Sequence, residues 1–149
     1  MTLLEIIDQD LIKVPLEGNT KNEVIEELVD LLEKKGCLDD RADVLSQVYA
    51  REAMGSTGLE KGIAIPHAKS TGVKSTVLAV GIKPGGIDFN ALDGNPSSIF
   101  FMILAPPSQS AQHIEILSEI AKATTSAAFC RVLSASRNAE EVLELFNEE

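Results

Sequence analysis

Residues 97–104 read SSIFFMIL and residues 75–82 read STVLAVGI, and these two apolar segments decide the fold. Both are rich in β-branched and bulky side chains and are too short for helices, so each predicts a buried strand. The connection between them reads PGGIDFNALDGNP. It is rich in turn-forming residues and predicts a tight turn at Asp93-Gly94.

Helical patterns precede and follow these strands. Thr20 and Glu23 form a capping-box pattern that starts a helix, and Gly36 is suited to end it. Further helices are predicted at 41–51, at 110–124 and in two shorter segments, the last beginning at Asn138, and further strands at 10–15 and 63–65. In the helix at 110–124, apolar spacing predicts an inward face made of Ile114, Leu117, Ile120 and Ala121. We therefore expect a single α/β domain over residues 1–149, with a mixed sheet flanked by helices on both sides.

The composition excludes several function classes. The chain has 149 residues, 44% of them hydrophobic, and a net charge of −10 from 23 acidic and 13 basic residues. An acidic chain without tryptophan is a poor binder of nucleic acid. No apolar run approaches the roughly 20 residues of a membrane span, and the N-terminus lacks the bases of a signal peptide. We expect a cytoplasmic protein that does not insert into a membrane.

The two cysteines, Cys37 and Cys130, lie far apart and have no metal-binding spacing. They predict buried, structural thiols in a reducing compartment. No other cluster of metal ligands and no nucleotide-binding motif is present, so neither a metal nor a cofactor is expected.

His67 is the candidate nucleophile. It follows the apolar run of residues 62–66, and Pro66 fixes its own φ and extends the residue before it. The histidine is therefore expected at a strand end on a stiff backbone, with the small Ala68 leaving space for an approaching group. A neutral imidazole is both a base and a nucleophile. Residue type and spacing also leave open a histidine with a purely structural loop role.

Several residues near His67 in sequence could bind an anion. Arg51 carries a fork of donors that suits phosphate, although a cation at a helix end also stabilises the helix dipole. Hydroxyls and flexible backbone amides for phosphate-loop support come from Ser56, Thr57, Gly58 and Gly62. His113 is the only other histidine. By position alone it is a helix cap or a surface residue.

The segment from Arg51 to Ala68, RE-x-x-x-STGLEKGIAIPHA, resembles the active-site signature of the fructose/mannitol-type enzyme IIA of the bacterial phosphotransferase system. The resemblance covers nearly the whole chain. It continues through IDF, LDGNP, FFMILAPP, the second histidine His113 and SASRNAEEVLEL. The chain departs from the family pattern at Glu60, where a second glycine is usual.

The resemblance implies a phosphocarrier. In that family the histidine of the AIPH motif accepts a phosphoryl group from the carrier protein HPr and passes it to a cysteine of enzyme IIB, which is linked to a membrane IIC permease. It implies that His67 is phosphorylated through Nε2, with Arg51 and His113 beside it. Because donor and acceptor are protein side chains, we expect a shallow site with an apolar rim that includes Ile63, Ile65 and residues near His113.

Two alternatives stay open beside sugar uptake. A sister branch, the nitrogen-type enzyme IIA, uses the same histidine to control other proteins, and a phosphorylation-inert binding domain is the third hypothesis. The segments HAKSTGVKS and FFMILAPP favour the sugar branch. The charge of −10 is interpreted equally as a means of steering a basic partner and as a means of solubility.

Overall fold

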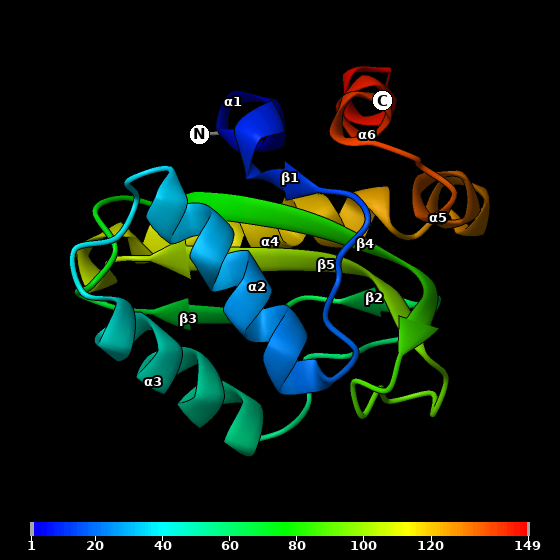
Figure 1. Cartoon of the computed structure of the whole chain (residues 1–149). Coiled ribbons are helices and arrows are strands. Elements are labelled where there is room, and N and C mark those ends of the chain that lie inside the picture. Colours follow the sequence, from blue (N-terminus) through cyan, green and yellow to red (C-terminus); the bar gives the residue numbers. More distant parts are fainter. Residues whose placement is uncertain (1, 149) are drawn as a thin grey trace.

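Two long strands, β4 (Val77–Ile87) and β5 (Ser97–Ala105), run antiparallel through the middle of the sheet (Figure 1). The computed structural model describes residues 2–148. β1 (Ile12–Lys13) lies beside β4 at one edge and is parallel to it. At the other edge β2 (Ile63–Ala64) and β3 (His67–Lys69) both pair in parallel with β5, one after the other along it. The mixed sheet predicted from the sequence is confirmed.

Helices cover both faces of this sheet (Figure 1). On one face lie α2 (Lys21–Lys34) and α3 (Arg41–Ala53). The other face carries α4 (Ser110–Ala123), α5 (Ala127–Ser134) and α6 (Ala139–Asn147). The remaining short helices are α1 (Leu3–Ile6), η1 (Gln9–Leu11) and η2 (Pro107–Gln109).

The continuous apolar run of β5 has a direct structural reason. Phe100, Met102 and Leu104 pack into the core beneath α2 and α3. The alternating residues of the same strand face the core beneath α4, α5 and α6. A strand buried on both faces needs apolar residues at every position, which is why this segment lacks the polar alternation of a surface strand.

The predicted helix signals are confirmed. The Thr20 hydroxyl accepts from the amide of Glu23 at 3.2 Å, and the Asn138 side chain caps α6. Gly36 follows α2 with a φ of +83°, the left-handed conformation in which glycine meets no steric penalty. These local contacts set where α2 begins and ends.

Two predictions of elements and one prediction of burial are wrong in part. β4 continues to Ile87 instead of ending at residue 82, because an irregularity in its pairing with β5 absorbs the first glycines of the turn-rich segment. The predicted strand at 10–15 is reduced to β1, because residues 9–11 form a 3-10 turn. Of the two cysteines, Cys130 is buried but Cys37 is only half-buried.

The inward face of α4 also differs from the prediction. Ile120 is buried as predicted and Leu117 packs partly buried against the same core, but Ile114 is 64% exposed and Ala121 lies on the surface, and His113 and Ile116 are buried in their place. Both rows have helical spacing, so periodicity alone does not select between them. Packing against β5 selects the row that contains the histidine.

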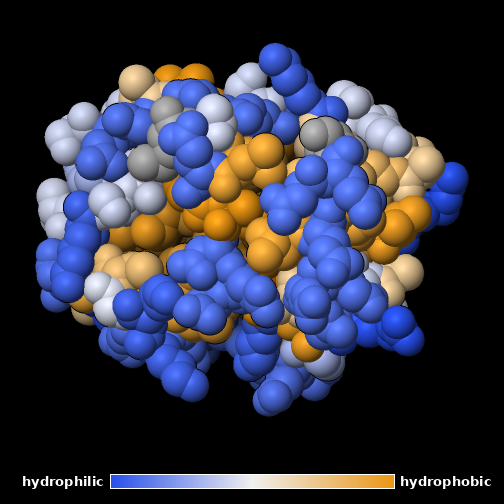
Figure 2. Space-filling model, turned by 90° about the horizontal axis from the view of Figure 1, so that it is seen from above, coloured by the Kyte–Doolittle hydropathy of each residue, from blue (hydrophilic) through white to orange (hydrophobic). Residues whose placement is uncertain are grey.

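The face that carries α1 and α6 shows apolar side chains in a channel between hydrophilic ones (Figure 2). A hollow of about 320 Å³ lies there, lined by Leu3, Leu4, Glu119, Lys122, Ala123 and Phe146. β1 and β3 stand at opposite edges of the sheet, so this channel is remote from His67. Within residues 2–148, no helix is both long and apolar enough to cross a bilayer.

Candidate active site

His67 is the first residue of β3, and the backbone before it is fixed from two sides. The Ile65 amide donates to the Thr57 carbonyl at 3.0 Å. The Pro66 carbonyl accepts from the Ile103 amide of β5, also at 3.0 Å. These contacts agree with the stiff strand-end presentation predicted from the sequence.

A single hydrogen bond determines which ring nitrogen of His67 is free. Nδ1 lies 2.7 Å from the carbonyl oxygen of Ile65. A carbonyl only accepts, so Nδ1 carries the proton and Nε2 of the neutral ring keeps its lone pair. Burial lowers the pKa of His67 and Arg51 lowers it further, against the opposing effects of the Ile65 carbonyl and Glu52. The ring is therefore neutral at pH 7, the form in which Nε2 is nucleophilic.

His113 projects from the first turn of α4 toward His67. The two ring centroids are 5.5 Å apart with the planes at 85°. His113 is only 4% exposed, yet within residues 2–148 neither of its ring nitrogens has a hydrogen-bond partner. Burial, followed by the nearby His67 and Lys69, lowers its pKa to about 4. A buried polar group without a partner is costly, and one beside a nucleophile is suited to bind an incoming group.

Arg51 lies in the last turn of α3 on the same side. One nitrogen of its guanidinium, Nη1, donates to the Gly55 carbonyl at 2.8 Å, which leaves most of the fork unused. Together α3, β3 and α4 enclose a hollow of about 310 Å³, lined by Gln47, Ala50, Arg51, Met54, His67, Ala68, Lys69 and His113. The structure thus brings together the three predicted residues His67, Arg51 and His113.

The four predicted phosphate-loop residues are not among those that line this hollow. The Ser56 hydroxyl donates to the Phe89 carbonyl and accepts from the Gly58 amide. The amide and hydroxyl of Thr57 both donate to the Glu52 carboxylate. The Gly62 carbonyl accepts from two amides at the start of β5. Their support of a phosphate stays a prediction, while the observed contacts hold the loop itself.

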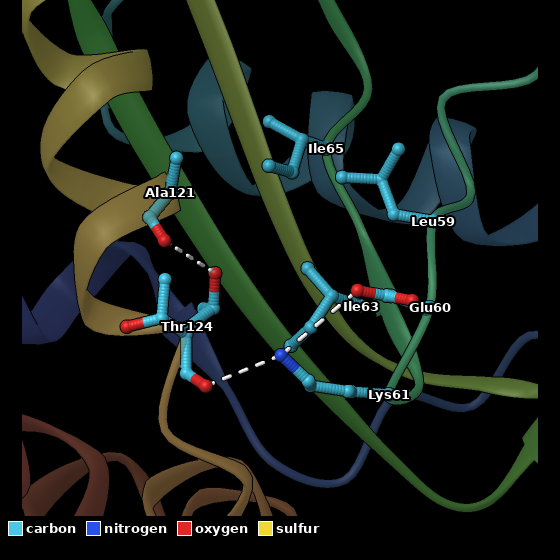
Figure 3. A pocket seen from close by; sticks show the side chains of 8 residues that line it. Leu59, Glu60, Lys61, Ile63, Ile65, Ala121 and Thr124 are labelled. Atoms are coloured by element: carbon cyan, nitrogen blue, oxygen red, sulfur yellow. Dashed lines mark hydrogen bonds and ion pairs between the residues drawn. The ribbon is translucent and has the colours of Figure 1, made fainter.

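The predicted apolar rim is wrong for Ile63 and Ile65. They are 2% and 6% exposed, and they line a separate hollow with the end of α4 (Figure 3). Both side chains belong to the core cluster that contains Ile116 and Ile120 of α4. The exposed apolar residue that lines the His67 hollow is instead Met54, which is 84% exposed, and Ile114, the apolar neighbour of His113 in sequence, is not among the residues that line it.

Sequence reasoning missed Glu52 and Lys69 as parts of this site. Lys69 lines the hollow, and the Glu52 carboxylate accepts a hydrogen bond from the amide of Thr57. One signal for Glu52 was present in the sequence. An acidic residue in the last turn of a helix opposes the helix dipole, so its position needs another explanation.

Comparison with known proteins gives this geometry its context. The family described as "Phosphoenolpyruvate-dependent sugar phosphotransferase system, EIIA 2" matches residues 5–149. The chain belongs to this family. EIIA domains of the phosphotransferase system are phosphoryl carriers, which agrees with the resemblance identified in the sequence.

Relatives of this EIIA chain carry two kinds of name. It is 32% identical over 148 residues to the fructose-specific EIIABC component of Bacillus subtilis (strain 168), covering 99% of the chain but only 23% of that relative. The nitrogen regulatory protein of Klebsiella oxytoca is 32% identical over 151 residues, covering 99% and 91%.

Solved structures confirm the fold. Nitrogen regulatory protein IIA-Ntr from Neisseria meningitidis aligns with a TM-score of 0.86 and 35% identity over 96% of this chain and 97% of that one. The IIA mannitol structure from Escherichia coli has a TM-score of 0.79 and 22% identity over 93% and 97%.

Proposed function

We propose that this EIIA chain accepts a phosphoryl group on Nε2 of His67 from phosphorylated HPr and passes it to a cysteine of an enzyme IIB. The observation that carries the proposal is the 2.7 Å hydrogen bond from Nδ1 to the Ile65 carbonyl, which leaves Nε2 as the free nucleophile. The hollow beside that ring is also lined by the guanidinium of Arg51 and by the imidazole of His113, which has no hydrogen-bond partner in the described part of the chain.

The transfer follows the ordinary chemistry of phosphoryl groups. The Nε2 lone pair forms a bond to phosphorus as the bond to the donor histidine nitrogen breaks, in line with it. The proton on Nδ1 stays in place, and the Ile65 carbonyl dipole stabilises the positive charge that develops on the ring. Arg51 and one N–H of His113 donate to the phosphoryl oxygens. In the second step a thiolate of IIB displaces His67 Nε2 from phosphorus.

The shape of the site fits a protein partner. The hollow is shallow and edged by the exposed Met54, so a protruding side chain of another protein can reach His67. Related structures support IIB as the acceptor: the Escherichia coli IIA mannitol protein was solved in complex with phosphorylated IIB. In this proposal the chain acts in the cytoplasm with HPr and IIB as its partners, and IIB connects it to a membrane IIC permease.

A regulatory role of the nitrogen type is the second candidate. It is favoured by the likeness to IIA-Ntr of Neisseria meningitidis, at 35% identity and a TM-score of 0.86. The chemistry at His67 is the same in both candidates, and they differ in what receives the phosphoryl group or senses it.

One experiment tests both steps. The protein is incubated with phosphoenolpyruvate, enzyme I and HPr, and an acid-labile phosphoryl adduct is expected. Purified IIB proteins of the fructose and mannitol types are then added, and the adduct is expected to move to one of them. An adduct that no IIB discharges favours the regulatory role, and the absence of any adduct contradicts the phosphocarrier proposal.

A further inference from the structure

Glu52 stands at the centre of a buried network beneath the site. Its side chain is 6% exposed, and its carboxylate lies 2.9 Å from Nζ of Lys21, the first residue of α2. The same carboxylate accepts from both the amide and the hydroxyl of Thr57, which is 3% exposed. A buried carboxylate with this many partners holds a fixed position.

The contacts of Thr57 continue from this network to the nucleophile. The Thr57 carbonyl accepts from the amide of Ile65 at 3.0 Å. The carbonyl of Ile65 in turn accepts from Nδ1 of His67 at 2.7 Å. The residue that determines the tautomer of His67 is therefore anchored, through Thr57, to the Glu52 carboxylate.

A second set of contacts fixes the Lys21 end of the network. Lys21 Nζ also lies 4.8 Å from the centroid of the Phe89 ring, and the Phe89 carbonyl accepts from the Ser56 hydroxyl. Residues 56 and 57 are thus held from two directions, by the lysine–glutamate pair and by the segment that follows β4. Neither Glu52 nor Lys21 lines the hollow itself.

We propose that Glu52, paired with Lys21, is a positioning residue that holds Thr57 and Ile65 so that His67 keeps its Nδ1–H tautomer and presents Nε2 to the phosphoryl group. The effect of Glu52 on the transfer rate rests on the proposed function, whereas its effect on the tautomer of His67 does not. The tautomer is a property of the unphosphorylated protein and can be observed without any partner.

The chain provides a matched control for this role. Glu27 is also a largely buried glutamate, 11% exposed, that pairs with a lysine, Lys13, at 2.7 Å. Its carboxylate likewise accepts from backbone amides, those of Glu17 and Gly18. None of these residues lines the His67 hollow. Substitution of Glu27 therefore reproduces the loss of a largely buried carboxylate that pairs with a lysine, without the link to His67.

The test compares Glu52→Ala and Glu52→Gln with Glu27→Ala and Glu27→Gln. Long-range ¹H–¹⁵N spectra of the imidazole rings report the tautomer of His67. We expect Glu52→Ala to show a new Nε2–H population and to slow phosphoryl uptake from phospho-HPr on the order of 10- to 100-fold, as expected for a misplaced reacting group. Glu52→Gln keeps an acceptor for Thr57 and should recover most of the rate. Both Glu27 variants should keep the wild-type tautomer and rate.

The outcomes separate the two proposals. A Glu52→Ala protein with the wild-type tautomer and the rate of Glu27→Ala would overturn the positioning role, whatever its stability. If wild type takes up no phosphoryl group, the proposed function fails while the spectra still decide the role of Glu52. Should Glu52→Ala not fold, Thr57→Val removes the hydroxyl link at similar side-chain volume. It must then shift the tautomer population for the proposal to stand.

Discussion

Two hollows lie on either side of the short segment from β2 to β3, and they differ in how their polar groups are satisfied. In the hollow of Figure 3, Lys61 Nζ donates to the Thr125 carbonyl at 3.2 Å and the Thr124 hydroxyl to the Ile120 carbonyl at 2.8 Å. In the His67 hollow, the buried His113 has no partner within residues 2–148 for either ring nitrogen. Ile65 contributes to both hollows. Its side chain lines the hollow of Figure 3, and its carbonyl oxygen accepts the hydrogen bond from Nδ1 of His67 in the other.

This contrast distinguishes a structural hollow from a reactive one. The two hollows are both small and open to solvent, so these properties do not distinguish the structural hollow from the reactive one. Unpaired donors in a buried position cost free energy in the resting protein, and that cost is recovered when a charged group binds. The predictions below test whether the difference in hydrogen bonding is also a difference in function.

The largest effect among the residues around His67 is expected for Arg51→Ala. Removal of a charged donor from developing phosphoryl charge typically costs about 10²- to 10³-fold in rate. The hydrogen bond from Arg51 to Gly55 is exposed to solvent, so the melting temperature should change little. Stopped-flow phosphoryl transfer and thermal unfolding measure the two properties. A large loss of stability with a matching loss of transfer would instead assign Arg51 a structural role.

His113→Phe should have the next largest effect. Phenylalanine fills similar space but donates no hydrogen bond, so transfer is expected to slow about 10- to 100-fold, less than for Arg51 because the lost donor is neutral. The free energy of unfolding should stay the same or rise, because two unpartnered buried nitrogens are removed. If the variant transfers phosphoryl groups at the wild-type rate, the difference in hydrogen bonding between the two hollows has no functional meaning.

The same substitution should alter how stability depends on pH. The pKa of His113 is lowered from 6.5 to about 4, so between these values the unfolded chain binds a proton that the folded chain does not. Stability is therefore lost as the pH falls through this window. Between pH 7 and pH 5, wild type should lose about 1–2 kcal/mol more than His113→Phe in denaturant titrations. Equal losses in the two proteins would show that folding does not lower the pKa of His113.

The smallest effect is expected on the other side of β2. Lys61→Met removes the hydrogen bond to Thr125, which is exposed to solvent, so stability should change by less than about 1 kcal/mol. The transfer rate should equal that of wild type. A clear loss of transfer would extend the reactive site to the hollow of Figure 3 and weaken the contrast.

Much of the fold was predictable because its signals are local. The β5 segment is apolar at successive positions because it is buried on both faces, and the Thr20 cap acts within one helical turn. The rotation of α4 about its axis was predictable only in part, since apolar spacing placed Ile114 inward together with Ile120, whereas packing buries His113 and Ile116 beside Ile120.

The candidate site also divides into features with a local sequence signal, which were predictable, and features set by packing, which were not. Pro66 and the residues around it are sufficient to predict a constrained histidine, Arg51 was a candidate anion ligand by its chemistry, and the family resemblance added His113 to the site. The Glu52–Thr57 contacts were missed because they depend on how the chain returns from α3 to β2, and this path follows from the pairing of β2 and β3 with β5. The rim was also misplaced, because Ile63 and Ile65 pack into the core with Ile116 and Ile120 of α4.

The most direct test is to locate the phosphoryl group. The protein is phosphorylated with phosphoenolpyruvate, enzyme I and HPr, and ¹⁵N and ³¹P NMR identify the modified nitrogen in wild type and in His67→Ala. We expect a single adduct on Nε2 of His67, with Nδ1 still protonated, and no adduct in the variant. A phosphoryl group on Nδ1, on His113, or retained by His67→Ala would contradict the account.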